Sequence, residues 1–411
     1  VASFDEYKKI LKKNSIILIL SGSIFNLKLR KKENIINRIF KMYNQDGLNS
    51  LKTLDGSFSI VLINIKNDNL ITIRDRHGSS LLFYKKDKNY LCIFTKIQFL
   101  KKIDFFKLKP NLKLIKKFIF EHYRYSYGGQ DSFFYKVNLF KHNSINILKN
   151  NTFYSKVLFK FKIKNTNTNK NINQLKKKFI NLLIKSLKKR YPEVQKKSGF
   201  FLSGGLDSPT IAGITAKHFN KRLRTFSIAY KEKNHVKNEM YYDESLLIKK
   251  ILDNNIFDST FIYPNSKNFI STFHEMLEVH DEPISSPTWY SHYLACKTMH
   301  RKKIKYVFGG DGGDHLLAGL YDDIPYFLAD LKFYKNKNFE YELQKWTELH
   351  DHPIFRKNKE IFEIYLKKCF KKKNKGKIFA YTWDESLMRK NNIYKKLRKK
   401  NLKIEKKKLF P

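Results

Sequence analysis

Between residues 173 and 308 the sequence alternates short apolar runs with segments of helix length. The pattern predicts strands at 199–202, 223–229, 258–263 and 304–308, and helices at 173–190, 208–219, 242–253, 267–280 and 289–300. Alternating strands and helices with short connections indicate a doubly wound parallel sheet. Ligands of such sheets bind at the carboxyl ends of the strands. The turns that follow the first and the last of these strands are therefore the first places to look for a site.

The turn after the first strand reads S-G-G-L-D-S over residues 203–208. Gly204 and Gly205 have no Cβ, so the backbone can take a positive φ and approach a ligand closely. We predict Ser208 as the N-cap of the next helix and Pro209 as its first residue. Successive amides and a helix N-terminus together form an anion site. The turn therefore predicts phosphate binding.

The S-G-G-L-D-S run resembles the pyrophosphate loop of the ATP pyrophosphatases, which cleave ATP between the α and β phosphates. The alternative P-loop pattern, G-x-x-x-x-G-K-S/T, does not occur in the chain. A glycine turn without any ligand is the plainer interpretation of such a segment. Serines on both sides and an acid inside favour the functional one. Asp207 is expected to hold Mg²⁺ against phosphate oxygens.

A second glycine turn follows the last predicted strand and reads G-G-D-G-G-D from Gly309 onwards. Its glycines, Gly310 among them, leave room for phosphates to approach. We predict Asp314 as a second Mg²⁺ ligand opposite Asp207, and Asp311 as a carboxylate that points to the reacting centre. A calcium-binding turn is the alternative, but the EF-hand order of acids is absent.

Taken together, the two turns resemble the synthetase domain of class B asparagine synthetases. Further matching segments follow in order, over about residues 16 to 320: L-D-G-S-F at 54–58, R-D-R-H-G at 74–78, T-F-S-I at 225–228, Y-D-E-S at 242–245 and D-E-P-I-S-S-P at 281–287. The first two resemble marks of the family's N-terminal-nucleophile glutaminase domain. The family resemblance thus extends to both halves of the chain.

The resemblance implies an ATP-dependent ligase that adenylates a carboxylate, aspartate or a related acid, and transfers it to ammonia or an amine. It implies Mg²⁺ on Asp207 and Asp314, and Asp311 as the residue that orients or deprotonates the amine. The residues implied in ATP binding are Leu202, Ser203, Gly204, Gly205, Asp207, Ser208, Ile228, Gly309 and Gly310.

The first part of the chain is rich in predicted strands. They lie at 16–20, 57–65, 70–73, 83–84 and 91–94, and the last ones are expected to continue one antiparallel meander. We therefore predict a degenerate glutaminase-like α+β sandwich followed by the α/β ATP pyrophosphatase domain. The predicted boundaries are 1–163 for the first domain, 164–172 for a polar linker and 173–411 for the second domain.

The glutaminase half departs from its family in the residues that carry its chemistry. Positions 1 and 2 are Val1 and Ala2, and no cysteine precedes Cys92. S-G-S at 21–23 stands where the family has N-G-E. Without a thiolate nucleophile we expect no glutamine hydrolysis, either because the sequence is a fragment or because the domain is degenerate. The family's catalytic lysine has no identifiable counterpart.

The formal net charge of +46 is typical of nucleic-acid-binding proteins, but the lysines are spread over the whole chain. We attribute the charge to compositional bias and expect no specific nucleic-acid partner. The three cysteines form no metal-binding pattern and are expected to be half-buried thiols. We expect a cytoplasmic protein that does not enter the membrane, and a homodimer stays open.

Three other functions remain as alternatives. A macrolactam or lasso-peptide-type cyclase would use an amine within the substrate. A tRNA-modifying ATP pyrophosphatase would share the S-G-G-x-D-S turn and exploit the positive charge. A truncated paralogue would bind ATP without catalysis.

Overall fold

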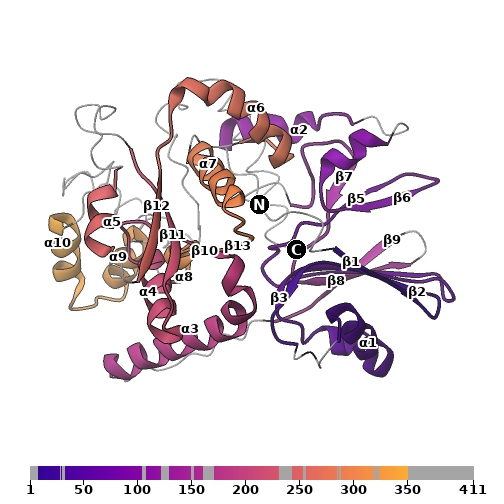
Figure 1. Ribbon diagram of the computed structural model, residues 1–411, viewed down its shortest axis with the longest axis horizontal. Helices are drawn as coiled ribbons and strands as arrows, with labels where there is room; N and C mark the ends of the chain where they lie inside the picture. Colours follow the sequence, from indigo (N-terminus) through magenta and orange to yellow (C-terminus); the bar gives the residue numbers. More distant parts are fainter. Residues whose placement is uncertain are drawn as a thin grey trace. The chain divides into compact units, whose positions relative to one another are not determined.

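The computed structural model (Figure 1) describes residues 8–27, 29, 33–103, 108–121, 129–149, 152–160, 171–230, 243–252, 256–284, 286, 288–317, 319 and 324–349. The chain divides into two compact units, residues 1–309 and 310–411, and each is described by itself. The predicted domain boundaries stay predictions, and most of the predicted linker lies outside the described residues.

The first unit begins with a six-stranded antiparallel sheet in the order β1-β2-β3-β4-β8-β9. Its strands are β1 (Lys8–Lys13), β2 (Ile16–Ile24), β3 (Gly56–Asn64), β4 (Asn69–Arg74), β8 (Ser144–Lys149) and β9 (Thr152–Val157). Successive side chains of a strand point to opposite faces of its sheet. Leu18, Leu20 and Ile24 of β2 are buried on one face, so Ser21 and Ser23 belong to the other.

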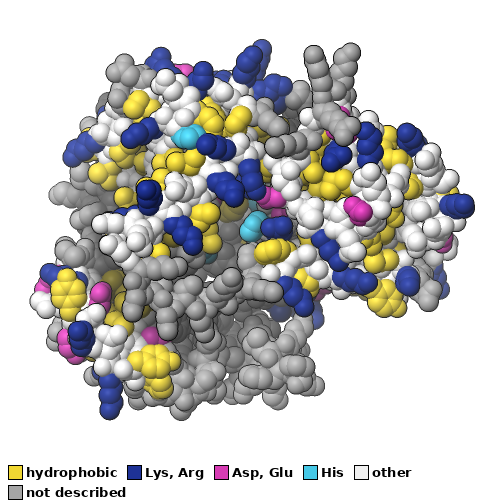
Figure 2. Space-filling view, turned by 90° about the horizontal axis from the view of Figure 1, so that it is seen from below, with side chains coloured by type: hydrophobic (Ala, Val, Ile, Leu, Met, Phe, Trp, Pro, Cys, Tyr) yellow, Lys and Arg dark blue, Asp and Glu magenta, His cyan; other side chains and the backbone are white. Residues whose placement is uncertain are grey.

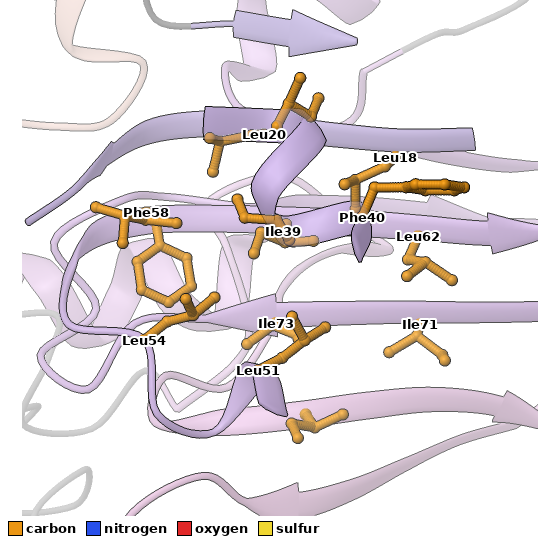
Figure 3. Close-up of a cluster of buried hydrophobic side chains, with 14 of the residues drawn as sticks. Leu18, Leu20, Ile39, Phe40, Leu51, Leu54, Phe58, Leu62, Ile71 and Ile73 are labelled. Carbon is orange, nitrogen blue, oxygen red and sulfur yellow. The ribbon is translucent and has the colours of Figure 1, made fainter. Parts of the chain in front are cut away.

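Helix α1 (Ile35–Leu51) covers the face on which Leu18 and Leu20 are buried. The helix begins where the side chain of Asn34 accepts a hydrogen bond from the amide of Ile36 (3.3 Å), as preferred at an N-cap. Ile39 and other α1 side chains pack on apolar residues of β2, β3 and β4 (Figure 3). This layer is the main core of the predicted first domain.

A second, three-stranded sheet packs on the opposite face of the six-stranded sheet. It has the order β6-β5-β7, with β5 (Phe83–Lys86), β6 (Leu91–Phe94) and β7 (Val137–Leu139). The Tyr84 ring lies 4.5 Å from that of Phe140 and 5.1 Å from that of Phe153, which joins the two sheets. The predicted α+β sandwich is confirmed. The remaining elements of this part are the 3₁₀ helix η2 (Ile97–Lys102) and helix α2 (Leu112–Glu121).

The prediction of one continuous meander is wrong, because β4 pairs with β8 and not with β5. The cause is the tight turn that follows β4. The carboxylate of Asp75 accepts hydrogen bonds from the amides of His77 (2.9 Å), Ser79 (3.2 Å) and Ser80 (3.0 Å). This turn takes the chain out of the first sheet before β5 begins.

The second half of this unit carries a four-stranded sheet in which every neighbouring pair is parallel, in the order β12-β11-β10-β13. The strands are β10 (Ser198–Phe201), β11 (Leu223–Ile228), β12 (Phe257–Ile262) and β13 (Tyr306–Phe308). The helices are α3 (Ile172–Val194), α4 (Asp207–Phe219), α5 (Ser245–Ile251), α6 (Phe269–His280) and α7 (Thr288–Arg301), with 3₁₀ turns η4 (Gln195–Lys197) and η7 (Ser266–Asn268). The predicted α/β domain is confirmed.

Helices cover both faces of the parallel sheet (Figure 1), as a doubly wound fold requires. On one face, Tyr191 of α3, Ala212 of α4 and Ile248 of α5 pack on Phe200 of β10. On the other face, Ala295 and Met299 of α7 pack on apolar residues of β11 and β12. The turn after β10 is therefore held between two packed layers.

The described part of the second unit is helical, with α8 (Gly313–Leu317), α9 (Ile324–Phe333) and α10 (Phe339–Leu349). Leu328, Ala329 and Leu343 form a small core between α9 and α10. Residues 350–411 lie outside the described part. Among the described helices, none combines the length and hydropathy needed for a membrane span.

The distribution of the cationic side chains and the state of the described cysteines agree with the predictions made from composition. Lys and Arg side chains are scattered over the visible face rather than gathered in one patch (Figure 2). Cys92 and Cys296 are free, half-buried thiols, as predicted, and burial raises the pKa of the Cys92 thiol. The third cysteine, Cys369, lies outside the described residues.

Candidate active site

The candidate site begins where β10 ends at the carboxyl edge of the parallel sheet. Leu202 is only 2% exposed and packs in the core beneath α4. Its amide donates to the carbonyl of Phe226 (3.0 Å), and its carbonyl accepts from the hydroxyl of Ser227 (2.7 Å). Ile228, half-buried, ends the neighbouring strand β11. Leu202 thus anchors the turn, and its contact with a nucleotide stays a prediction.

Hydrogen bonds between its own residues close the turn after Leu202. The amide of Ser203 donates to the Oγ of Ser208 (2.9 Å), and the two serine hydroxyls lie 3.0 Å apart. The amide of Gly205 donates to the Oγ of Ser203 (3.3 Å). The hydrogen bonds of Ser203 and Ser208, the two serines of the S-G-G-L-D-S run, therefore fix the conformation of the turn.

The predicted N-cap is wrong by two residues. Helix α4 begins at Asp207, its N-cap is Leu206, and no side chain caps it. Ser208 is instead the second residue of the helix, and its buried hydroxyl accepts a hydrogen bond from the amide of Ser203. Pro209 is the third residue of the helix, and it fits there because the first amides of a helix have no intrahelical acceptor.

The glycines act through close packing rather than through a left-handed backbone. Neither Gly204 nor Gly205 has a positive φ. A Cβ on Gly204 would lie 2.8 Å from the Cβ of Leu247 and 3.0 Å from the Cβ of Glu244. The amide of Gly204 donates to the Glu244 carboxylate (2.9 Å). The turn therefore already binds one anionic group, supplied by the residue that precedes α5.

Glu244 was missed as a site residue in the sequence. It was noted only as part of the Y-D-E-S segment, of which Tyr242 lies outside the described residues. Asp243 of the same segment accepts from the amide and the hydroxyl of Ser245 (3.2 and 2.8 Å), which fixes the start of α5. An acidic pair directly before a short helix is the signal that would have pointed to it.

Asp207 lies half-buried in the first turn of α4, beside the amides at the helix N-terminus. Those amides have no intrahelical acceptor, so a phosphate would find donors there. The ion pairs of the described residues do not include Asp207. Its carboxylate is therefore available to a cation.

The second turn begins beside the first. Phe200 of β10 pairs with Phe308 of β13, so the two strands end side by side and Gly309 follows at the same edge. Gly310 and the residues after it belong to the second unit. There Gly312 has a φ of 88°, and the amide of Gly313 donates to the carbonyl of Gly310 (3.0 Å), which closes a tight turn before α8.

Asp311 and Asp314 are both exposed, Asp314 in the first turn of α8. Both belong to the second unit, so their approach to Asp207 stays a prediction. Within the described ranges, no three His, Cys, Asp or Glu residues gather into a cluster that would hold a metal alone. Two carboxylates plus substrate phosphates would suit Mg²⁺ without such a cluster.

Two of the recognised segments connect the two halves of the first unit. Asp281, from the D-E-P-I segment, accepts hydrogen bonds from the amides of Ile97 (2.8 Å) and Gln98 (3.0 Å) at the start of η2. Asp55, from the L-D-G segment, pairs with Lys189 (3.2 Å) and Arg190 (3.5 Å) of α3. Asp281 and Asp55 therefore have a structural role in this chain. The sequence motifs to which they belong did not predict that role.

Comparison with known proteins gives two family matches. The family described as asparagine synthase matches residues 178–400, which is more than half of the chain. The family described as a glutamine amidotransferase domain matches residues 10–158. The matched ranges contain the parallel sheet and the antiparallel sandwich respectively.

Similar individual proteins carry related names. A protein of Methanocaldococcus jannaschii named "Putative asparagine synthetase (glutamine-hydrolyzing) 2" is 25% identical over 327 residues, which is 75% of this chain and 60% of that protein. A Mycobacterium bovis protein named "Putative asparagine synthetase (glutamine-hydrolyzing)" is 27% identical over 123 residues, 29% of this chain and 17% of its own. The chain thus spans about three fifths of the first relative.

Among solved structures, the NH3-dependent NAD synthetase of Campylobacter jejuni matches 52% of this chain and 99% of its own at 15% identity. The TM-score of that match is 0.25.

Proposed function

The chain belongs to the asparagine synthase family, and on this premise we propose that it is an ATP-dependent ligase that forms amide bonds. In this proposal it joins the carboxylate of one substrate to AMP, releases pyrophosphate, and then transfers the acyl group to ammonia or an amine. The acid is aspartate or a related small carboxylate.

The observation that carries the proposal is the turn between β10 and α4. It lies at the carboxyl edge of a parallel sheet, where ligands of this architecture bind. The Gly204 amide is held by the Glu244 carboxylate, which fixes the turn. The first amides of α4 have no intrahelical acceptor and lie at the end of the helix that follows this turn. Such a set of donors is suited to the β and γ phosphates of ATP.

Mg²⁺ fits the acids present, and Asp207 and Asp314 are the residues that would hold it. When bound, the ion would neutralise charge on the pyrophosphate leaving group. The chain's own contribution is the fixed orientation of the turn amides, which stabilise the same charge without reorganisation. Asp311 is placed in the proposal to orient the amine or accept a proton from it.

Hydroxylamine trapping tests the proposal. The full chain is incubated with MgATP, hydroxylamine and one carboxylic acid at a time, starting with aspartate, and the nucleotide and hydroxamate products are measured. We expect AMP, pyrophosphate and one acyl hydroxamate in equal amounts. ADP and phosphate as products, or no hydroxamate with any acid in folded protein, would overturn the assignment.

The cyclase alternative is separated by the same assay. A cyclase would form the adenylate only with a peptide acid and would release a ring without added amine. We retain the small-acid ligase as the proposal because the relatives named above are all asparagine synthetases by name.

A further inference from the structure

The amino edge of the parallel sheet carries a pocket of about 320 Å³, at the other end of the strands from the candidate active site. Ser198, the first residue of β10, and Leu223, the first residue of β11, both line it. The length of β10 is about 10 Å, so the pocket is separate from the turn that follows Leu202. The proposed reaction therefore leaves this pocket without a role.

The charged side chains of the pocket are all positive. Among the described residues that line it, Lys196, Arg222 and Arg224 are cations and none is an acid. They come from two segments, one before β10 and one at the start of β11, which the parallel pairing of the two strands brings together. All of the lining residues belong to the first compact unit. The pocket thus gathers positive charge from two parts of the chain.

Carboxylates do not neutralise these cations within the described part of the chain. None of the three takes part in the ion pairs of the described residues. Lys196 and Arg222 are exposed, and Arg224 is half-buried. Like charges around one pocket repel each other, and an anion bound between them would relieve that repulsion. The charge of the pocket therefore favours an anionic ligand.

Hydrogen bonds hold Arg224 in place before any ligand binds. Its Nη2 donates to the carbonyl of Lys196 (2.6 Å) and to the carbonyl of Ser198 (3.3 Å). Carbonyl groups have no net charge, so the guanidinium keeps its positive charge. Among the hydrogen bonds of the described residues, none uses its Nε or Nη1. These groups can donate to phosphate oxygens, and the side chain is already ordered.

The neutral residues of the pocket suit binding rather than catalysis. Tyr191 is only 2% exposed and packs on Phe200 in the core. Burial raises the pKa of the Tyr191 phenol, so it stays protonated at neutral pH. The hydroxyl of Ser198 donates to the carbonyl of Gln195 (2.9 Å). The described lining has no thiol, imidazole or carboxylate that would act as a nucleophile or base.

Size and charge together indicate the kind of anion. Sites for small ligands measure about 300–1,000 Å³, and this pocket lies at the lower end of that range. A phosphate monoester carries a charge of about −1.5 to −2 at neutral pH. Three cations therefore exceed the charge of one phosphate group and approximately balance two. Guanidinium groups also match the geometry of phosphate oxygens.

We propose that this pocket is a second anion site, which binds a diphosphate group through Lys196, Arg222 and Arg224. Inorganic pyrophosphate and a nucleoside diphosphate share this chemistry. In either case the ligand binds without being converted. The inference is independent of the proposed function, because no step of the ligase reaction takes place in the pocket.

Calorimetric titration tests the kind of ligand. The full chain, without Mg²⁺ or ATP, is titrated with pyrophosphate, ADP, inorganic phosphate and citrate. We expect pyrophosphate or ADP to bind at least tenfold more tightly than phosphate, and the tighter of the two identifies the source of the diphosphate. Added salt should weaken the binding. Citrate that binds as tightly as the better diphosphate, or no binding of either diphosphate, would overturn the inference.

Variants test the assigned cations. Arg222→Gln is expected to weaken binding of the better diphosphate about tenfold, and Lys196→Gln about threefold. Lys221→Gln is the matched control, because Lys221 is exposed and adjacent in the sequence but does not line the pocket. Since Arg222 is exposed, its substitution should leave the melting temperature unchanged. Equal affinities of Arg222→Gln and Lys221→Gln would contradict the site.

Hydrogen exchange separates this pocket from the turn after β10, which is also proposed to bind phosphates. We expect the diphosphate to protect residues 195–200 and 222–225, and Arg222→Gln to lose that protection while any protection at 203–208 remains. Protection confined to 203–208 would show that the anion binds only at the turn, and the inference would be wrong. If Arg222-dependent binding is found but no acid is ever adenylated, the ligase assignment fails and this site stands.

Discussion

Glu244 is a residue of the candidate site that was not predicted from the sequence. Its carboxylate holds the Gly204 amide at 2.9 Å, in the turn proposed to bind the phosphates of ATP. A charge-assisted hydrogen bond of this kind contributes about 1.5–3 kcal/mol. Because it fixes one amide of the turn, Glu244 acts in our account as a positioning residue.

We therefore expect Glu244→Ala to bind ATP about tenfold more weakly, which corresponds to about 1.4 kcal/mol. Glu244→Gln keeps an acceptor oxygen for the Gly204 amide and should stay within about threefold of the parent chain. Calorimetric titration with a non-hydrolysable ATP analogue measures both. Unchanged affinity in Glu244→Ala would show that the bond does not position the turn.

Asp75 shows what the R-D-R-H-G segment contributes in this chain. It is fully buried and accepts three backbone amides, while Arg74 beside it donates to the carbonyls of Gly78 and Ser80 (both 2.9 Å). These bonds shape the turn that separates β4 from β5. The R-D-R-H-G segment therefore has a structural role in the antiparallel sandwich.

Asp75→Ala removes the acceptor of three amides in the turn after β4, so we expect a loss of about 3 kcal/mol in the free energy of unfolding. Denaturant unfolding followed by circular dichroism measures it. Asp46→Ala, an exposed acid in α1, is the control and should change stability by less than about 0.5 kcal/mol. Equal effects of the two substitutions would contradict the structural role.

At the scale of elements, periodicity and glycine placement predicted the strands and helices of the α/β half well. The predicted strand 223–229 is observed as β11, and the predicted helix 289–300 as α7. Local signals decide such elements because each must present an apolar face to one core. The pairing of β4 with β8 was missed because it depends on the tertiary turn at Asp75, which periodicity does not encode.

The turn between β10 and α4 gives a matched pair of substitutions. Gly204→Ala would place a Cβ 2.8 Å from that of Leu247, and α5 would have to move. Overpacking of this kind costs about 1–3 kcal/mol, so we expect a lower melting temperature and about tenfold weaker ATP binding.

Gly205→Ala is the control, because its Cβ would meet only the Ser203 hydroxyl, at an ordinary 3.4 Å. Differential scanning fluorimetry and ATP titration should show it near the parent chain. If both variants behave alike, close packing against α5 is not the reason for glycine at position 204.

The connection between α6 and η2 is also testable. Asp281→Ala removes the acceptor of the Ile97 and Gln98 amides, so we expect both to exchange hydrogen at least tenfold faster. Glu278→Ala, an exposed acid on α6, is the control. Hydrogen exchange by mass spectrometry over residues 95–103 reads the effect, and unchanged protection in Asp281→Ala would contradict the contact.

For the whole molecule, the sequence predicted the family and both architectures but only part of the site. The first turn was predicted as a site because glycine, serine and aspartate at a strand end have a recognisable chemistry, and its contacts with a ligand stay a prediction. The contact of Glu244 with the turn and the pocket at the amino edge of the sheet were not predicted, because each is made by segments that are separate in the chain. Close approach of distant segments has no local signature in the sequence.

The net charge of +46 is a property of the whole chain and does not by itself identify a binding site. Scattered cations raise weak, salt-dependent binding to any polyanion without defining a site.

The central claim is that the turn after β10 holds ATP for cleavage between its α and β phosphates. Acid-dependent exchange of labelled pyrophosphate into ATP tests it most directly, with Asp207→Asn compared against Asp258→Asn, an exposed acid on β12. The account predicts exchange in the parent chain and in Asp258→Asn, and a loss of about 100-fold in Asp207→Asn. Exchange that survives in Asp207→Asn at the parent rate would contradict it.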